Sequence, residues 1–232
     1  MGDSPNPGPP APADVPGQVA VVGGGTMGSG IVHVLLAAGI RTILCEVDDA
    51  ALERAVIMVT TSLEGAESRG KLRETVPQTL ARLITTTAHV RLGEADVVIE
   101  AVPEIPDLKI QLLTSIERHL APDTVLATNT SSLSLKSLAK PLAHPHRFVG
   151  MHFFNPVPVQ VLLEIVRISA TDAATMRTVR ALAAVLGKET IEINDSPGFA
   201  TSRLGVLIGL EAIRMVEEGV ASPEDIDKAM VL

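Results

Sequence analysis

The chain contains no tryptophan or tyrosine, only four phenylalanines and a single cysteine among its 232 residues. One cysteine cannot form a disulfide bond within the chain, and Cys45 follows the apolar run Thr42-Ile43-Leu44, where we expect a buried, unreactive thiol. No apolar run reaches membrane-spanning length. A net charge of -8 without a basic cluster argues against general nucleic-acid binding. These absences predict a cytoplasmic protein whose partners are small molecules.

The beginning of the chain differs in composition from the rest. Residues 1–17 are mostly proline, glycine, alanine and aspartate, and they lack the basic start and apolar stretch of a secretory signal. We expect a disordered tail over 1–17. The chain as a whole is 46% hydrophobic and 20% charged, which suits one or two globular domains with a sizeable core.

Short β-branched runs alternate with helical patterns after the tail. Strands are expected at residues 18–22, 41–46, 97–102, 124–128, 148–152 and 162–168, and helices at 26–38, from 48 or 49 onward, and at 108–120. This alternation predicts an α/β domain over residues 18–195, with a Rossmann-type, mainly parallel sheet and helices on both faces.

The pattern changes near residue 195. The turn-forming stretch DSPG at 195–198 precedes a long apolar helical pattern over 199–216, and no strand follows it. Ser222 and Pro223, followed by two acids, predict another helix start. We therefore expect residues 196–232 to be the start of an all-helical domain that is truncated at Leu232.

A glycine motif, GxGxxG, lies between the first strand and the first helix, at Gly23, Gly25 and Gly28. In a dinucleotide site the three glycines allow a tight turn, close approach of a pyrophosphate and helix-strand packing. Alone the pattern is weak, because a flexible loop could hold the same glycines. Glu46 ends the second strand where an acid accepts hydrogen bonds from the adenosine ribose and repels a 2′-phosphate. Together they predict NAD binding.

Three further stretches with polar residues lie at the carboxyl ends of predicted strands. They are EAVPE at 100–104, NTSS at 129–132 and GMHFFNP at 150–156. In a parallel sheet the carboxyl ends of the strands border the ligand crevice, so these stretches are candidate site segments. Simpler interpretations exist: Ser131 or Ser132 could cap the next helix, and a histidine beside apolar residues is often a core side chain.

Five motifs in order carry a family resemblance: GGGTMGSGI, DVVIEAVPE followed by LK, NTSSLSL, GMHFFNPVP and DSPGF. Together they resemble the L-3-hydroxyacyl-CoA dehydrogenase family, which includes 3-hydroxybutyryl-CoA dehydrogenases, over residues 18–232. The resemblance implies a Rossmann-type NAD domain, followed by a helical domain that closes the cleft and forms a homodimer.

The same resemblance implies residue roles. His152 is the general acid/base, with Glu164 as its partner, while Ser131 and Asn155 contact the substrate oxygen. Cofactor contacts are implied for Gly23, Gly25, Thr26, Met27, Gly28, Glu46, Ala101, Glu104, Lys109, Asn129, Ser131 and Asn155. From the residues alone, Glu104 and Lys109 would be interpreted as a surface ion pair. No residue is assigned to a metal site.

One position departs from the family pattern. Ser202 stands where members commonly carry asparagine, so a substrate contact from the helical domain is expected to be lost or bridged by water.

The function implied is NAD-dependent interconversion of (S)-3-hydroxyacyl-CoA, such as 3-hydroxybutyryl-CoA, and 3-oxoacyl-CoA, such as acetoacetyl-CoA. Two alternatives stay open. One is a 3-hydroxyacid dehydrogenase with a catalytic lysine, although the GMHFFNP motif argues against it. The other is an NAD-binding protein with little turnover. Arg69, Lys71 and Arg73 could meet the anionic CoA, although a solvated helix end explains them as well.

Overall fold

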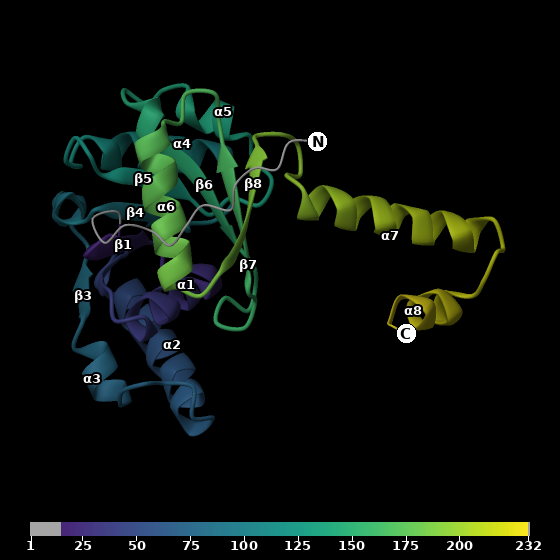
Figure 1. Ribbon diagram of the computed structural model, residues 1–232, viewed down its shortest axis with the longest axis horizontal. Coiled ribbons are helices and arrows are strands. Elements are labelled where there is room, and N and C mark those ends of the chain that lie inside the picture. The colour runs from purple at the N-terminus through teal and green to yellow at the C-terminus, as the bar shows by residue number, and fades with distance from the viewer. Residues whose placement is uncertain (1–14, 232) are drawn as a thin grey trace.

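The computed structural model describes residues 15–231, so most of the expected tail at 1–17 lies outside the described residues. One sheet of eight strands forms the centre of the molecule, and two helices at the carboxyl end of the chain extend away from it (Figure 1). No helix among residues 15–231 is long and apolar enough to cross a membrane.

The sheet order is β3-β2-β1-β4-β5-β6-β7-β8. The strands are β1 Gln18–Val22, β2 Arg41–Cys45, β3 Leu83–Thr86, β4 Val97–Glu100, β5 Val125–Thr128, β6 Phe148–Phe153, β7 Leu162–Arg167 and β8 Glu189–Asn194. Neighbouring strands run parallel except β6 and β7, which are antiparallel. The chain returns from β3 at one edge to β4 beside β1. Strand order therefore reverses between β1 and β4, which is where a parallel sheet opens a ligand crevice.

Helices cover both faces of the sheet. They are α1 Thr26–Ala37, α2 Asp49–Ser68, α3 Val76–Leu80, α4 Pro106–Glu117, α5 Leu135–Ala139 and α6 Ala173–Val185, with short 3₁₀ turns η2 His89–Glu94 and η3 Pro145–Arg147. Because side chains alternate along a strand, β1 supplies Val19 and Val21 to the core under α1, α2 and α6. Its Ala20 and Val22 join the opposite core under η2, α4 and α5. The Rossmann-type fold expected from the sequence is confirmed.

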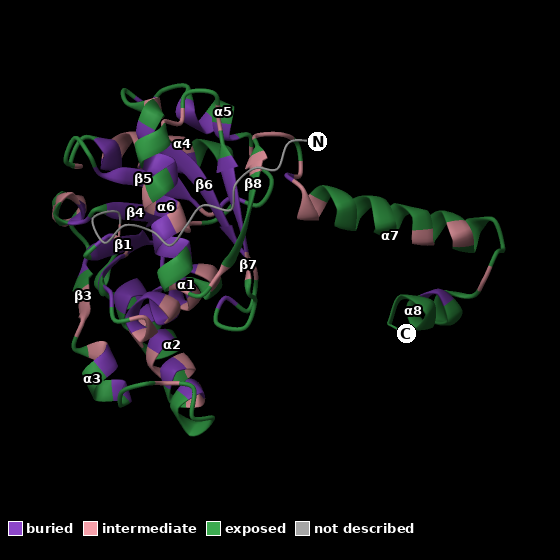
Figure 2. Ribbon diagram, viewed as in Figure 1, coloured by how far each residue is buried: buried purple, intermediate pink, exposed green. Residues whose placement is uncertain are grey.

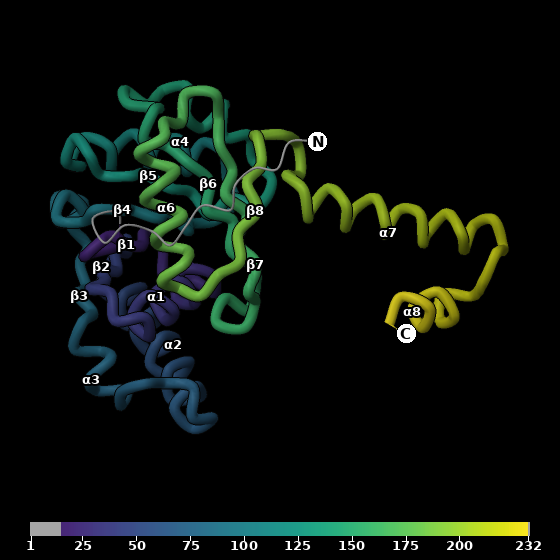
Figure 3. Tube along the Cα trace, in the orientation of Figure 1, coloured from purple at the N-terminus to yellow at the C-terminus, as the bar shows by residue number. Residues whose placement is uncertain are grey.

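The carboxyl-terminal helices are α7 Thr201–Glu217 and α8 Pro223–Val231. Figures 1 and 3 show α7 leading away from the sheet and α8 at its far end. No residue of α7 is buried, and Figure 2 colours the helix almost entirely as exposed. Phe199, just before α7, is 3% exposed and packs in the core under α4 and α5. The root of the helical segment is therefore fixed to the sheet, while α7 itself is not covered.

Candidate active site

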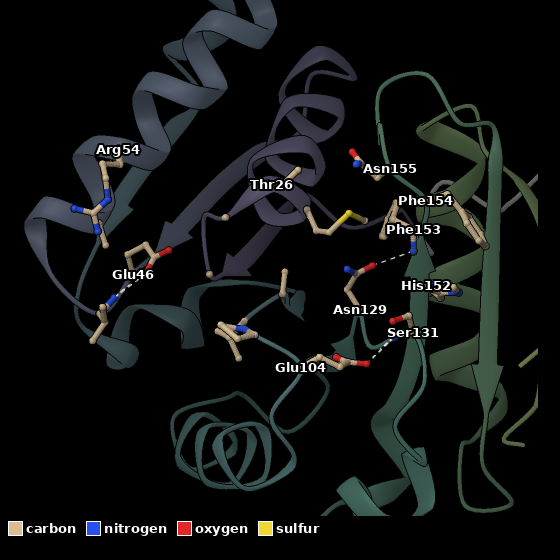
Figure 4. Close-up of a pocket in the computed structure, with 18 residues that line it drawn as sticks. Thr26, Glu46, Arg54, Glu104, Asn129, Ser131, His152, Phe153, Phe154 and Asn155 are labelled. Atoms are coloured by element: carbon tan, nitrogen blue, oxygen red, sulfur yellow. Dashed lines mark hydrogen bonds between the residues drawn. The ribbon is translucent and has the colours of Figure 1, made fainter. Parts of the chain in front are cut away.

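A cleft of about 760 Å³ opens at the carboxyl ends of the parallel strands. Its lining residues are Gly23, Gly25, Thr26, Met27, Glu46, Val47, Ala51, Arg54, Ala101, Val102, Pro103, Glu104, Asn129, Ser131, His152, Phe153, Phe154 and Asn155. Figure 4 places Glu46 and Arg54 at one end of the cleft, and Ser131, His152 and Asn155 at the other. The volume suits a ligand of cofactor size.

The glycine motif forms the turn between β1 and α1. Gly23 has φ +95°, and a Cβ there would lie 2.9 Å from the carbonyl oxygen of Ala101, so a side chain is excluded on both counts. A Cβ on Gly28 would lie 1.7 Å from the Gly23 carbonyl oxygen. Gly25, the residue before α1, faces open space in the cleft. The loop therefore presents bare backbone at a helix N-terminus, the arrangement that binds a phosphate group.

Glu46 follows β2 directly and lies beside the glycine loop. Its carboxylate accepts a hydrogen bond from the backbone N–H of Gly24 and a second, of 3.0 Å, from Val47. These bonds fix the carboxylate at the end of the cleft where the dinucleotide motif predicts the adenosine ribose (Figure 4).

His152 and Glu164 form a buried pair across two strands. They are direct partners in the antiparallel register of β6 and β7, with His152 Nδ1 2.6 Å from Glu164 Oε2. His152 is 5% exposed and Glu164 is 0% exposed. Because Nδ1 is engaged by the carboxylate, Nε2 is the ring nitrogen left for a ligand in the cleft. An imidazole held in this way can take or give a proton.

The imidazole ring is also held by aromatic neighbours. The Phe154 ring centroid lies 4.5 Å from that of His152, and the Phe199 centroid lies 5.6 Å away at an interplanar angle of 61°. Two of the chain's four phenylalanine rings therefore pack against the imidazole, and one of them, Phe199, lies just before the helix α7.

The loop after β5 is tied to Glu104. One oxygen of this carboxylate accepts the N–H of Ser131 at 2.9 Å and that of Ser132 at 3.2 Å, together with the Thr130 hydroxyl. Burial by itself would raise the pKa of Glu104, but these hydrogen bonds and the charge of Lys109 outweigh it and lower the pKa. The ionised carboxylate thus fixes Ser131 beside the cleft. Asn129, at the start of the same loop, accepts the N–H of Phe153 at 2.9 Å.

Lys109 lies behind the cleft wall rather than at the surface. It is 1% exposed, its Nζ lies 2.6 Å from Glu100 Oε1, and it lies 3.3 Å from Glu104 Oε2. The surface ion-pair interpretation is therefore wrong for Lys109. Glu100, 0% exposed, is a partner that the sequence did not assign. An acid at the end of a buried strand, nine residues before a lysine on the next helix, is the signal that was available.

The structure separates the predicted site residues into two groups. Gly23, Gly25, Thr26, Met27, Glu46, Ala101, Glu104, Asn129, Ser131, His152 and Asn155 line the cleft. Gly28, Lys109, Glu164 and Ser202 do not; Glu164 lies behind His152, and Ser202 lies in the first turn of α7. Arg54 and Phe154 line the cleft without having been assigned. Arg69, Lys71 and Arg73 line a different cavity of about 630 Å³, beside His33 and Ser62.

Family models and similar proteins match almost the whole of this chain. Residues 18–196 match the family model for the NAD binding domain of 3-hydroxyacyl-CoA dehydrogenase, and residues 198–232 match that for its C-terminal domain. A 3-hydroxybutyryl-CoA dehydrogenase of Mycobacterium tuberculosis is 42% identical over 217 residues, covering 92% of this chain and 76% of that protein. A probable 3-hydroxybutyryl-CoA dehydrogenase of Bacillus subtilis is 39% identical, covering 93% of this chain and 75% of that protein.

A solved structure is also similar. The crystal structure of (S)-3-hydroxybutyryl-CoA dehydrogenase from Ralstonia eutropha superposes with a TM-score of 0.89 at 40% sequence identity, covering 93% of this chain and 77% of that one. With the glycine loop and the buried histidine-glutamate pair in one cleft, these matches show that the chain belongs to the NAD-dependent 3-hydroxyacyl-CoA dehydrogenase family.

Proposed function

We propose that this protein interconverts (S)-3-hydroxyacyl-CoA and 3-oxoacyl-CoA, with His152 as the general acid/base. The observation that carries the proposal is that His152, paired with the buried Glu164, lines the same cleft as the glycine loop. Oxidation of a secondary alcohol needs a base to remove the hydroxyl proton as hydride leaves the carbon. NAD, when bound at the glycine loop, supplies the hydride acceptor.

Glu164 supports the acid/base in two ways. Its bond to Nδ1 fixes the ring so that Nε2 is the nitrogen offered to the substrate hydroxyl, and its negative charge offsets the imidazolium that forms. Glu164 also accepts hydrogen bonds from the backbone N–H groups of Ala200 and Thr201, which hold the carboxylate in place behind His152.

Ser131 and Asn155 complete the proposed site. Both line the cleft at the end where His152 lies (Figure 4), and both side chains can donate a hydrogen bond. We assign them to the substrate oxygen, whose charge changes during the reaction, so contacts there stabilise the transition state. Short-chain substrates are the first to test, because the similar proteins from Mycobacterium tuberculosis and Ralstonia eutropha are named 3-hydroxybutyryl-CoA dehydrogenases.

The two parts of the chain have different proposed roles. We assign NAD binding to residues 18–195 and dimer formation to the helical segment 196–232, whose long helix α7 has no buried residue. An apolar helix without cover is stabilised by pairing with a second copy.

Replacing His152 with glutamine tests the reaction. Because the amide cannot exchange a proton near neutrality, kcat for NADH oxidation with acetoacetyl-CoA should fall about a hundredfold or more while NADH affinity is kept. His144→Gln is the matched control, since His144 is exposed and does not line the cleft. An active His152→Gln enzyme would refute the role of His152. Wild-type protein that binds NADH but turns over no acyl-CoA of any chain length would favour the NAD-binding alternative.

A further inference from the structure

The turn before α7 places the first residues of the helical segment on the Glu164 carboxylate. Gly198 and Phe199 both have positive φ, +73° and +51°, in the turn between β8 and α7. A positive φ is uncommon for a residue other than glycine, and the buried side chain of Phe199 fixes this turn against the sheet. The chain therefore reaches the back of the candidate site at Ala200 and Thr201.

Glu164 is saturated by this segment together with His152. Oε1 accepts the backbone N–H of Ala200 at 3.2 Å and that of Thr201 at 2.9 Å. Oε2 accepts His152 Nδ1 at 2.6 Å and the Thr201 hydroxyl at 3.1 Å. Within residues 15–231, Thr201 is the only side chain besides His152 that hydrogen-bonds this carboxylate.

We propose that Thr201 is a positioning residue that acts on His152 through Glu164, an inference that rests on the proposed function. Two backbone N–H groups hold Oε1, whereas among the described residues Oε2 is held only by the imidazole and the Thr201 hydroxyl. It limits rotation of the carboxylate plane, so Oε2 stays aligned with Nδ1. The hydroxyl comes from the first residue of α7. The orientation of His152 therefore depends on where the start of α7 packs against the sheet domain.

The test compares side chains that differ in the hydroxyl. Thr201→Val keeps the shape of the side chain and removes the hydroxyl. If the valine variant folds poorly, Thr201→Ser and Thr201→Ala provide a second comparison, because these two side chains differ by one oxygen atom. Loss of one hydrogen bond to a charged group should lower kcat about tenfold in valine and alanine, with KM for acetoacetyl-CoA and NADH affinity unchanged. Serine should restore most of kcat. In a Glu164→Gln background, Thr201→Val should add less than about a twofold loss, since the pair is already broken.

A spectroscopic readout separates this proposal from the proposed function. The proton between His152 Nδ1 and Glu164 should give a downfield ¹H NMR resonance that is absent in Glu164→Gln and is shifted or broadened in Thr201→Val but not in Thr201→Ser. Wild-type kcat in both valine and alanine variants, equal losses in the two backgrounds, or an unmoved resonance would each overturn the role of Thr201. If wild-type protein lacked turnover, the resonance alone would decide for Thr201, and the proposed function would fail separately.

Discussion

Glu46 is the residue that we expect to select between NAD and NADP. Its carboxylate is fixed by the N–H groups of Gly24 and Val47, so it cannot easily move aside for a 2′-phosphate. Glu46→Ser should weaken NADH binding and shift the ratio of NADPH to NADH affinity upward about tenfold, because the repulsion disappears. NADH and NADPH fluorescence titrations measure both affinities, and the chain has no tryptophan or tyrosine to interfere.

The ratio is the informative quantity in that experiment. Glu46→Ser also removes the bond to Gly24, which can weaken both dinucleotides equally through the glycine loop. Glu53→Ser is the matched control, because Glu53 is exposed on α2 and does not line the cleft. An unchanged ratio would mean that Glu46 does not face the ribose.

The sequence predicted the site residues that lie in short motifs better than those that meet only in space. The glycines and Glu46 could be assigned from local order, because strand, turn and helix follow one another directly. The pairing of His152 with Glu164 came from the family resemblance. From the residues alone it requires the β6-β7 register, which turns a separation of 12 residues into a direct contact. Thr201 was missed because its contact depends on a turn with positive φ at Phe199.

The packing of α1 on α2 contains a buried histidine that should make stability depend on pH. His33 Nδ1 lies 2.8 Å from the Ser62 hydroxyl, and burial, with the charges of Arg69 and Lys188, lowers the pKa of His33 from 6.5 to about 4. The unfolded chain therefore binds a proton here at a higher pH than the folded chain does. Stability from this group is fully present above about pH 6.5 and is lost as pH falls toward about 4.

The loss between those pH values should be on the order of 3 kcal/mol for a shift of this size. In His33→Gln the side-chain amide can still hydrogen-bond Ser62 but does not titrate. The stability of this variant should therefore fall less steeply as the pH is lowered. Urea unfolding followed by far-UV circular dichroism from pH 7.5 to 5 measures the slope, with exposed His144→Gln as control. Parallel pH slopes for wild type and His33→Gln would exclude His33 as the cause.

At the level of elements, the strands with strong apolar patterns were predicted and the weak edge strands were not. The buried strands β1, β4 and β5 have uninterrupted β-branched or apolar runs, which is the pattern of a parallel sheet covered on both faces. β3 has a single buried residue, Thr86, and β8 has none, because these two strands lie at the edges of the sheet. Such edge strands have little apolar signal, so tertiary pairing rather than sequence pattern defines them.

The whole molecule combines a well-packed sheet domain with an uncovered helix. The apolar side chains of α7 are at least 40% exposed at Leu204, Val206, Leu207, Ile208, Leu210, Ile213 and Val216. Val206, Leu210 and Ile213 recur at i, i+4 and i+7, so they form one stripe along the helix. A continuous stripe of this kind indicates an interaction surface rather than scattered surface apolar residues.

We therefore expect the chain to self-associate through α7. Burying the stripe between two copies removes apolar surface from water, and the mutual contact is self-complementary if the two helices pack about a two-fold axis. Sedimentation velocity over a range of protein concentrations should show a concentration-dependent dimer or larger species.

Leu210→Lys together with Ile213→Lys should weaken association at least about tenfold, because each lysine resists burial without a partner. Val90→Lys is the control, since Val90 is 65% exposed in η2, outside the helical segment. NADH binding should persist in all three proteins, because none of these side chains lines the cleft. A wild-type chain that sediments as a monomer at every concentration would show that the stripe on α7 does not pair copies of this chain.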